Sequence, residues 1–245
     1  MAPTIAPTPT AGAGFSALWD LPGLVIQCIT LSTRPERRRA AQAQFDAVGL
    51  GGRVRWLEQT PDIEDGKRGC FHGHQRAARA ALELDARMAL TFEDDVVFLP
   101  HFAPSCAGRV AAFLRAPAAA DWQVFFLGHF PRKMELTGQP DAVKVRSMDG
   151  QAYFLSRAGM EALCELEYAG EQVDVHFHYR CERAYALYPM VAVQAAGHSD
   201  TEAGLERAPD WNDDKLTRER ELYEGCVKRK AVAAAVAMMG GLGVG

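Results

Sequence analysis

The pattern of apolar and polar residues predicts alternating strands and helices in the first half of the chain. Leu24–Leu31 is a nearly continuous apolar run, which is typical of a strand buried on both faces of a sheet. The following Thr33-Arg34-Pro35-Glu36 has capping-box spacing, so we expect a helix from there to about Val48, ended by Gly49. A short strand, a helix and a third strand follow at Val54–Leu57, His74–Ala86 and Met88–Phe92. This alternation favours an α/β fold with a mostly parallel central sheet and helices on both faces.

The second half of the chain continues with less regular elements. Strands are predicted at Gln123–Leu127, Val143–Arg146, Gln151–Leu155 and Met190–Val193, and helices at about 103–115, 157–167, 174–183 and 213–230. Residues 1–22 are rich in Pro, Ala, Thr and Gly and are expected to form a flexible leader, and residues 231–245 form an apolar Gly/Ala-rich tail. No linker interrupts residues 23–230, so we expect one compact domain there.

Composition and charge narrow the function classes. The chain is 48% hydrophobic and 24% charged, which is ordinary for a globular domain. A net charge of -4 argues against nucleic acid as a partner, because no basic field exists to gather it. The six cysteines form no CxxC pair, so reduced thiols in the cytoplasm are expected.

The C-terminal tail leaves two alternatives open. Lys228-Arg229-Lys230 precedes the apolar stretch AVAAAVAMMGGLGVG, a weak pattern for peripheral contact with the inner membrane surface. Its four glycines disfavour a helix, so a frayed tail is the other reading. No apolar stretch of about 18 residues occurs that could span a membrane.

The acidic cluster Glu93-Asp94-Asp95 is the most informative feature. It closes an apolar strand, and ligands of open α/β sheets bind beyond the carboxyl ends of strands. Because alternate side chains of a strand face the same way, Glu93 and Asp95 are expected to share one cation while Asp94 faces elsewhere. Hard oxygen ligands suit Mn²⁺ or Mg²⁺, which neutralise a departing diphosphate. The alternative to a metal site is a solvent-exposed acidic turn without a functional role.

Several further motifs surround this cluster in a fixed order, and together they resemble glycosyltransferase family 25, the lipopolysaccharide and procollagen β-galactosyltransferase group. The resemblance runs from about Val25 to Glu202. It rests on Leu31-Ser32-Thr33-Arg34-Pro35-Glu36-Arg37, Gly69-Cys70-Phe71-His72-Gly73-His74, Glu93-Asp94-Asp95-Val96, Gly150-Gln151-Ala152-Tyr153-Phe154-Leu155-Ser156, Val173-Asp174 and Ser199-Asp200. Two positions depart from the family pattern: Thr30 stands where Asn is usual, and Gly73 where Ser is usual.

The resemblance implies a GT-A-type nucleotide-sugar-binding fold and an inverting transfer. The donor would be a UDP-hexose, with galactose or glucose as the sugar, and the acceptor a glycan or glycolipid. Residues of the matching motifs would then line the donor site, namely Leu31, Arg34, Arg37, His74, Asp94, Gly150 and Gln151. The guanidinium groups of Arg34 and Arg37 suit phosphate, although a solvent-exposed basic helix face would also explain these two arginines.

An inverting transfer also needs a base for the acceptor hydroxyl. Asp174 is the first candidate, because the N–H groups of a first helical turn are expected to keep it ionised. Asp149 is the second candidate, although a turn-forming role also explains it. His198, after the last apolar strand, is a candidate third metal ligand beside Glu93 and Asp95.

Two other functions remain as alternatives. A catalytically silent domain of the same fold would bind a nucleotide or a glycan without transferring sugar. A metal-dependent nucleotidyl or phosphoryl transferase is disfavoured, because neither GxxxxGK[ST] nor GxGxxG occurs in the chain.

Overall fold

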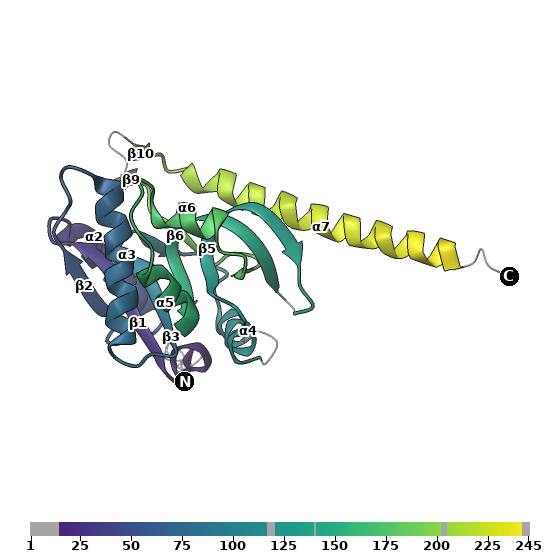
Figure 1. The fold of residues 1–245 in the computed structure, drawn as a ribbon, viewed down its shortest axis with the longest axis horizontal. Coiled ribbons are helices and arrows are strands. Elements are labelled where there is room, and N and C mark those ends of the chain that lie inside the picture. Colours follow the sequence, from purple (N-terminus) through teal and green to yellow (C-terminus); the bar gives the residue numbers. More distant parts are fainter. Residues whose placement is uncertain (1–14, 117–120, 140, 202–204, 242–245) are drawn as a thin grey trace, which may run out of the picture.

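A computed structural model describes residues 15–116, 121–139, 141–201 and 205–241. For residues 238–241 it describes the backbone alone. Its centre is a six-stranded sheet with the order β2-β1-β3-β6-β5-β7 (Figure 1). The strands are β1 (Leu24–Leu31), β2 (Arg55–Gln59), β3 (Met88–Glu93), β5 (Val124–Leu136), β6 (Ala142–Ser156) and β7 (Ala184–Leu187). Short strands outside this sheet are β4 (Val96–Phe98), β8 (Ala192–Gln194), β9 (Gly197–His198) and β10 (Glu206–Arg207).

Five of the six central strands run in one direction. β1 pairs in parallel with β2 and β3, and β5 pairs in parallel with β7. Only β6 runs against its neighbours, between β3 and β5. The predicted mostly parallel sheet is therefore confirmed, and the carboxyl ends of β1 and β3 meet at one edge.

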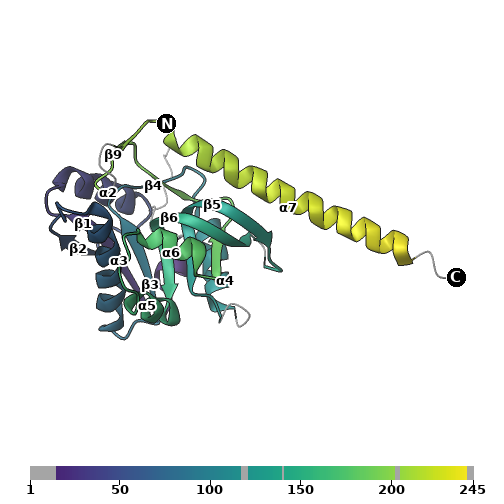
Figure 2. The ribbon, with the colours of Figure 1, turned by 45° about the horizontal axis from the view of Figure 1, so that its top comes forward.

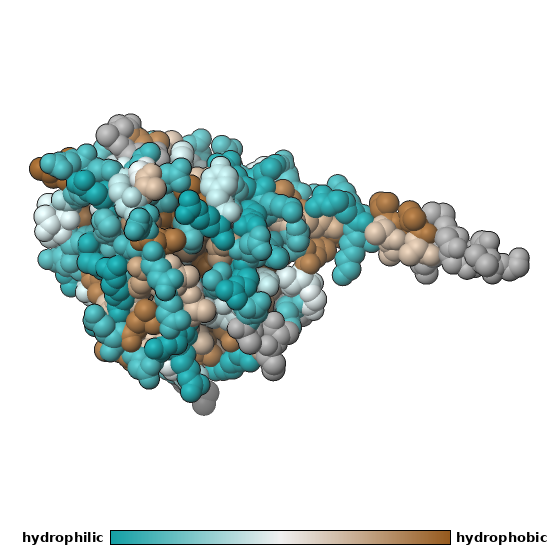
Figure 3. Space-filling model, viewed as in Figure 1, coloured by the Kyte–Doolittle hydropathy of each residue, from teal (hydrophilic) through white to brown (hydrophobic). Residues whose placement is uncertain are grey.

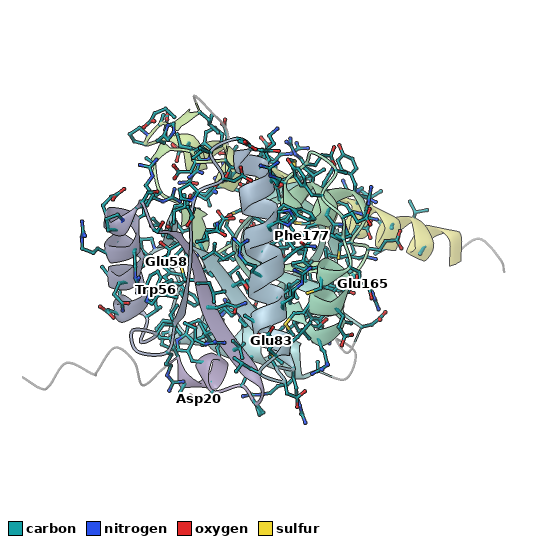
Figure 4. All side chains as sticks on the ribbon, turned by 60° about the vertical axis from the view of Figure 1, so that its left-hand side comes forward. Asp20, Trp56, Glu58, Glu83, Glu165 and Phe177 are labelled. Carbon is teal, nitrogen blue, oxygen red and sulfur yellow. The ribbon has the colours of Figure 1, made fainter. Side chains whose placement is uncertain are left out.

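Helices cover both faces of this sheet. The helices are α1 (Ser16–Trp19), α2 (Pro35–Ala47), α3 (Gly66–Leu82), α4 (Pro104–Arg115), α5 (Arg157–Cys164), α6 (Val173–Tyr179) and α7 (Trp211–Gly241). One apolar cluster joins the sheet to α1, α2 and α4, with Phe45 and Phe92 in contact at its centre. A second joins the opposite face to α3, α5 and α6 around Tyr153 and Phe177. In Figure 4, α3 runs down the front, with Trp56 to one side and Phe177 to the other.

Most predicted elements are present with shifted ends. β1 spans the predicted residues, whereas α3 begins eight residues before His74, because Asp65 caps it by accepting hydrogen bonds from the backbone N–H groups of Lys67 and Arg68. The two strands expected at Val143–Arg146 and Gln151–Leu155 form a single strand, β6. The apolar pattern is interrupted between Arg146 and Gln151, where β6 bulges.

The two chain ends differ from expectation. Residues 1–14 lie outside the described residues, but Phe15, Leu18, Trp19 and Leu21 are buried in the core, so residues 15–22 are not a flexible leader. At the other end, α7 continues unbroken from the predicted domain into the predicted tail and projects from the body (Figures 1 and 2). None of the described helices is long and apolar enough to cross a membrane.

Candidate active site

The acidic cluster lies where the chain leaves the sheet. Glu93 is the last residue of β3, and Asp94-Asp95 form a tight turn into β4. All three carboxylates line one cavity at the carboxyl ends of β1 and β3. The strand alternation assumed for the sequence ends at Glu93, so the expectation that Asp94 faces away from Asp95 is wrong. The turn brings the two adjacent aspartates to the same arginine.

That arginine is Arg37, in the first turns of α2. One guanidinium nitrogen lies 2.7 Å from Asp94 Oδ1 and 3.1 Å from Asp95 Oδ2, and another lies 2.8 Å from Asp200 Oδ2. Asp94 is also held by β1, because Thr30 Oγ1 donates to its Oδ2 at 2.8 Å. The arginine thus joins three carboxylates from separate parts of the chain.

Asp95 has a second positive partner, Arg207 from β10. Arg207 Nη1 lies 2.5 Å from Asp95 Oδ2, and the Arg207 side chain is only 9% exposed. The other carboxylate oxygen, Asp95 Oδ1, is buried and receives no hydrogen bond from the described residues. Asp95 therefore keeps one acceptor oxygen that the described side chains leave available.

Glu93 contacts a different set of side chains. Its Oε1 lies 3.1 Å from Nε2 of the buried His74, whose Nδ1 lies 2.6 Å from the hydroxyl of Tyr153. Cys70, one helical turn before His74 on α3, lines the same cavity. Glu93 and Cys70 also line a second, neighbouring cavity, so they stand between the two.

This second cavity, of about 370 Å³, holds the two candidate bases. Asp174 lies in the first turn of α6, and its Oδ2 accepts a hydrogen bond of 3.1 Å from the backbone N–H of Asp149. Lys215 from α7 reaches the Asp149 carboxylate at 2.5 Å and is almost fully buried. The volume falls within the range of small-molecule sites.

A bulge in β6 places Asp149 in the wall of the second cavity. Between the paired residues Gly128–Ala152 and Phe130–Met148, β6 has three intervening residues where β5 has one. Asp149 itself has a φ of 65°, a left-handed conformation that costs free energy for a residue with a side chain. Bulges of this kind redirect side chains and are frequent beside active sites.

Burial sets the protonation of these carboxylates. It raises the pKa of Asp94 to about 6 against the opposing charge of Arg37, and raises the pKa of Asp95 with help from the charge of Glu93. Burial also raises the pKa of Asp174 to about 6, and the backbone N–H groups of Asp149 and Val175 only partly offset this effect. Glu93 differs: burial opposes its ionisation, but His74 and the arginines lower its pKa overall. The cluster thus carries buried negative charge that a cation would stabilise.

The structure brings together most of the predicted site residues. Leu31, Arg37, His74 and the acidic triplet line the first cavity, and Asp149, Gly150 and Asp174 line the second. Arg34 lines neither cavity, since its guanidinium holds Asp200. Gln151 is fully buried beneath the site, with its Nε2 lying 3.4 Å from the Ala192 carbonyl.

His198 does not join the acidic cluster. It lies in the short β9–β10 pair with its side chain 49% exposed, and its Nδ1 lies 3.7 Å from Glu206. Because it lines neither cavity, the prediction that His198 is the third metal ligand is not supported by its position.

Sequence reasoning missed Arg207 and Lys215, the two buried cations that pair with Asp95 and Asp149. Neither residue stands in a recognisable motif. Each is a single basic residue in a polar segment of the C-terminal quarter, and only its burial distinguishes it from a surface charge. In the sequence Asp200 belongs only to the Ser199-Asp200 motif, and the structure shows that it pairs with both Arg34 and Arg37.

Comparison with known proteins gives distant structural likenesses only. No protein-family model and no curated protein matches the chain. Among solved structures, A197 from STIV is 14% identical with a TM-score of 0.48, covering 72% of this chain and 86% of its own. A glycosyltransferase involved in glycosylation of the PBCV-1 major capsid is 11% identical with a TM-score of 0.46, covering 82% and 98%. A UDP-glucose pyrophosphorylase complexed with UDP-glucose is 8% identical with a TM-score of 0.40, covering 86% of each chain.

Proposed function

We propose that this protein is a metal-dependent glycosyltransferase that uses a nucleotide-sugar donor. The observation that carries the proposal is the pair of adjoining cavities. One contains the acidic cluster at the carboxyl ends of β1 and β3, and the other contains Asp174 and Asp149. Glu93 and Arg207 line both. A donor in the first cavity and an acceptor in the second would place the transferred sugar at their junction.

Glu93 and Asp95 are the proposed ligands of Mn²⁺ or Mg²⁺. Asp95 Oδ1 is a buried oxygen to which the described residues donate no hydrogen bond, and such an oxygen suits a hard cation. Glu93 and Asp95 would hold such a cation, which would supply positive charge to stabilise a departing diphosphate. Arg37 and Arg207 hold the cluster in place and add positive charge beside the same phosphates.

Asp174 is the proposed base, with Asp149 as the alternative. Its carboxylate lies in the second cavity and is oriented by the backbone N–H groups of Asp149 and Val175. A pKa of about 6 leaves it ionised at neutral pH yet more basic than a solvated aspartate, which suits proton transfer from a hydroxyl. Attack by that hydroxyl opposite the leaving diphosphate would invert the sugar configuration.

The donor sugar, the acceptor and the cellular location are inferred from the resemblance to glycosyltransferase family 25. We propose a UDP-hexose donor carrying galactose or glucose, a glycan or glycolipid acceptor, and a cytoplasmic place in lipopolysaccharide assembly. Trp211 and Phe130 line the second cavity, where the acceptor is proposed to bind, and offer aromatic faces against which a sugar ring can pack.

The deciding experiment incubates the purified protein with UDP-, GDP- and CMP-sugars, with Mn²⁺ or with chelator, and measures release of the nucleotide. We expect release from a UDP-hexose with Mn²⁺, and loss of that release in Asp95→Asn. The exposed Asp20 supplies the matched control, since Asp20→Asn removes a carboxylate far from both cavities. Donor binding without any release would favour the catalytically silent alternative, and the absence of both would refute the proposal.

We also propose peripheral membrane contact through the end of α7. Helix residues 227–237 are all exposed and include the basic Lys228-Arg229-Lys230, and Figure 3 shows apolar side chains on the projecting arm. Val232 and Val236 are 63% and 58% exposed. Sedimentation with anionic vesicles should recover the protein, and Val232→Glu together with Val236→Glu should weaken this recovery. Equal recovery of both proteins would contradict the contact.

A further inference from the structure

Cys70, His74 and Glu93 converge on one point beside the proposed donor site. Cys70 and His74 are four residues apart on α3 and therefore share one face of that helix. Glu93 approaches them from the end of β3. One ligand atom from each residue, a sulfur, a ring nitrogen and a carboxylate oxygen, lies within 4.8 Å of the other two.

The surroundings fix the orientation of the His74 ring within this set. His74 is 2% exposed, and the Tyr153 hydroxyl lies 2.6 Å from its Nδ1, while its Nε2 faces Glu93. Metal-binding histidines use one ring nitrogen as ligand and bond the other to a second residue, which fixes the ring and its tautomer. Tyr153 is fully buried, so it supplies such a fixed partner.

The ligand types indicate which metals would bind. Thiolate and imidazole ligands select zinc-like transition metals, whereas Mg²⁺ and Mn²⁺ prefer oxygen alone. Ligands on one tetrahedral Zn²⁺ lie roughly 3.5 Å apart, so small side-chain rotations would close the observed set around an ion. Cys70 and Glu93 both line the cavities, which gives the ion an entry path and an open fourth position.

We propose that Cys70, His74 and Glu93 form a binding site for Zn²⁺ or another thiophilic divalent cation, distinct from the proposed Glu93–Asp95 site. Because Glu93 belongs to both sets, an ion held by Cys70 and His74 would compete with the cation of the donor site. Thiophilic metals would then inhibit donor binding, and the competition would make the enzyme sensitive to metal supply.

The test uses Co²⁺ alone, without nucleotide, so its outcome does not depend on whether the protein transfers sugar. Titration of the reduced full-length protein should give a sulfur-to-cobalt charge-transfer band, and added Zn²⁺ should displace it. Cys70→Ser should abolish the band and weaken Co²⁺ binding by at least about tenfold, since it removes a direct ligand. Cys164→Ser is the matched control, because Cys164 is also half-buried but lies outside the cluster, on α5.

A second variant and a second measurement keep the result interpretable. Glu93→Gln should weaken Co²⁺ binding but keep the charge-transfer band at saturation, because Cys70 still binds. In the wild-type protein, Zn²⁺ should protect Cys70 from alkylation, mapped by mass spectrometry, while Cys164 reacts as before. Co²⁺ binding of equal strength in Cys70→Ser, or a band that depends on Cys164, would overturn the proposal, as would unprotected Cys70.

Discussion

We predict that Asp174→Asn makes the protein more stable at high pH but a slower catalyst. Burial raises the pKa of Asp174 from 3.8 to about 6, so folding favours the protonated carboxyl. The stability that protonation provides is fully present below the unfolded pKa and is lost as pH rises through about 6. A shift of about two units corresponds to about 3 kcal/mol once both states are ionised.

The Asp174→Asn variant removes this dependence while keeping the shape. The two carboxylate oxygens accept hydrogen bonds from the backbone N–H groups of Asp149 and Val175, at 3.1 and 2.8 Å. An amide can accept only one of them, which costs about 1 kcal/mol at every pH. Because that cost is the same at every pH, it does not affect the pH dependence, and the stability of the variant relative to wild type should rise by about 2 kcal/mol between pH 4 and pH 8.

Urea unfolding of both proteins at pH 4, 6 and 8 measures this difference, with Glu171→Gln as an exposed control. Under the same proposal, Asp174→Asn should keep donor and metal binding but lose about two to four orders of magnitude in transfer rate. Asp149→Asn should cost much less. If the two stability curves stay parallel, the buried carboxyl does not titrate as argued. A variant that transfers sugar at the wild-type rate removes Asp174 from the role of base.

Three other variants test the site and the core. Asp95→Asn should leave the melting temperature of the metal-free protein equal or higher, because burial and the charge of Glu93 disfavour the ionised carboxyl; calorimetry showing a large decrease would mean that pairing with Arg207 stabilises the fold. Phe45→Ala should cost about 3–5 kcal/mol in urea unfolding, since Phe45 is fully buried, and a loss below about 1 kcal/mol would contradict its central place. Gly128→Ala should cost about 1–3 kcal/mol in thermal unfolding, because its Cβ would lie 2.1 Å from the Ala192 carbonyl oxygen, and an unchanged melting temperature would refute that contact.

The sequence predicted the sheet well where burial leaves a periodic signal. Leu24–Leu31 reads as an apolar run because Ile26 and Cys28 pack on one face while Val25 packs on the other. The strand that ends in Glu93 is recognisable for the same reason. In contrast, Asp149 lies inside β6 with a left-handed backbone, and local propensity reads such a residue as a turn. A bulge depends on the neighbouring strand, which the sequence does not display.

The candidate site was predictable only where residues are close in the chain. Glu93-Asp94-Asp95 and the Cys70–His74 spacing are visible as local patterns, although neither pattern shows that Glu93 lies beside Cys70 and His74. Arg207 could not be assigned to Asp95, because 112 residues separate them and a lone arginine carries no periodic signal. The sequence shows His198 only as a residue that follows an apolar strand, whereas in the fold that strand leads to the exposed β9–β10 pair.

The last helix shows most clearly why the site depends on the whole chain. α7 looks like a charged surface helix in sequence, yet Lys215 and Glu219 are each 2% exposed. Glu219 accepts hydrogen bonds from the backbone N–H of Met190 at 3.0 and 3.1 Å, which anchors the helix against the strand region. That anchor places Lys215 at Asp149 and Trp211 in the wall of the second cavity. Because buried charges persist only when they are paired, the docking of α7 and the arrangement of the candidate bases stabilise each other.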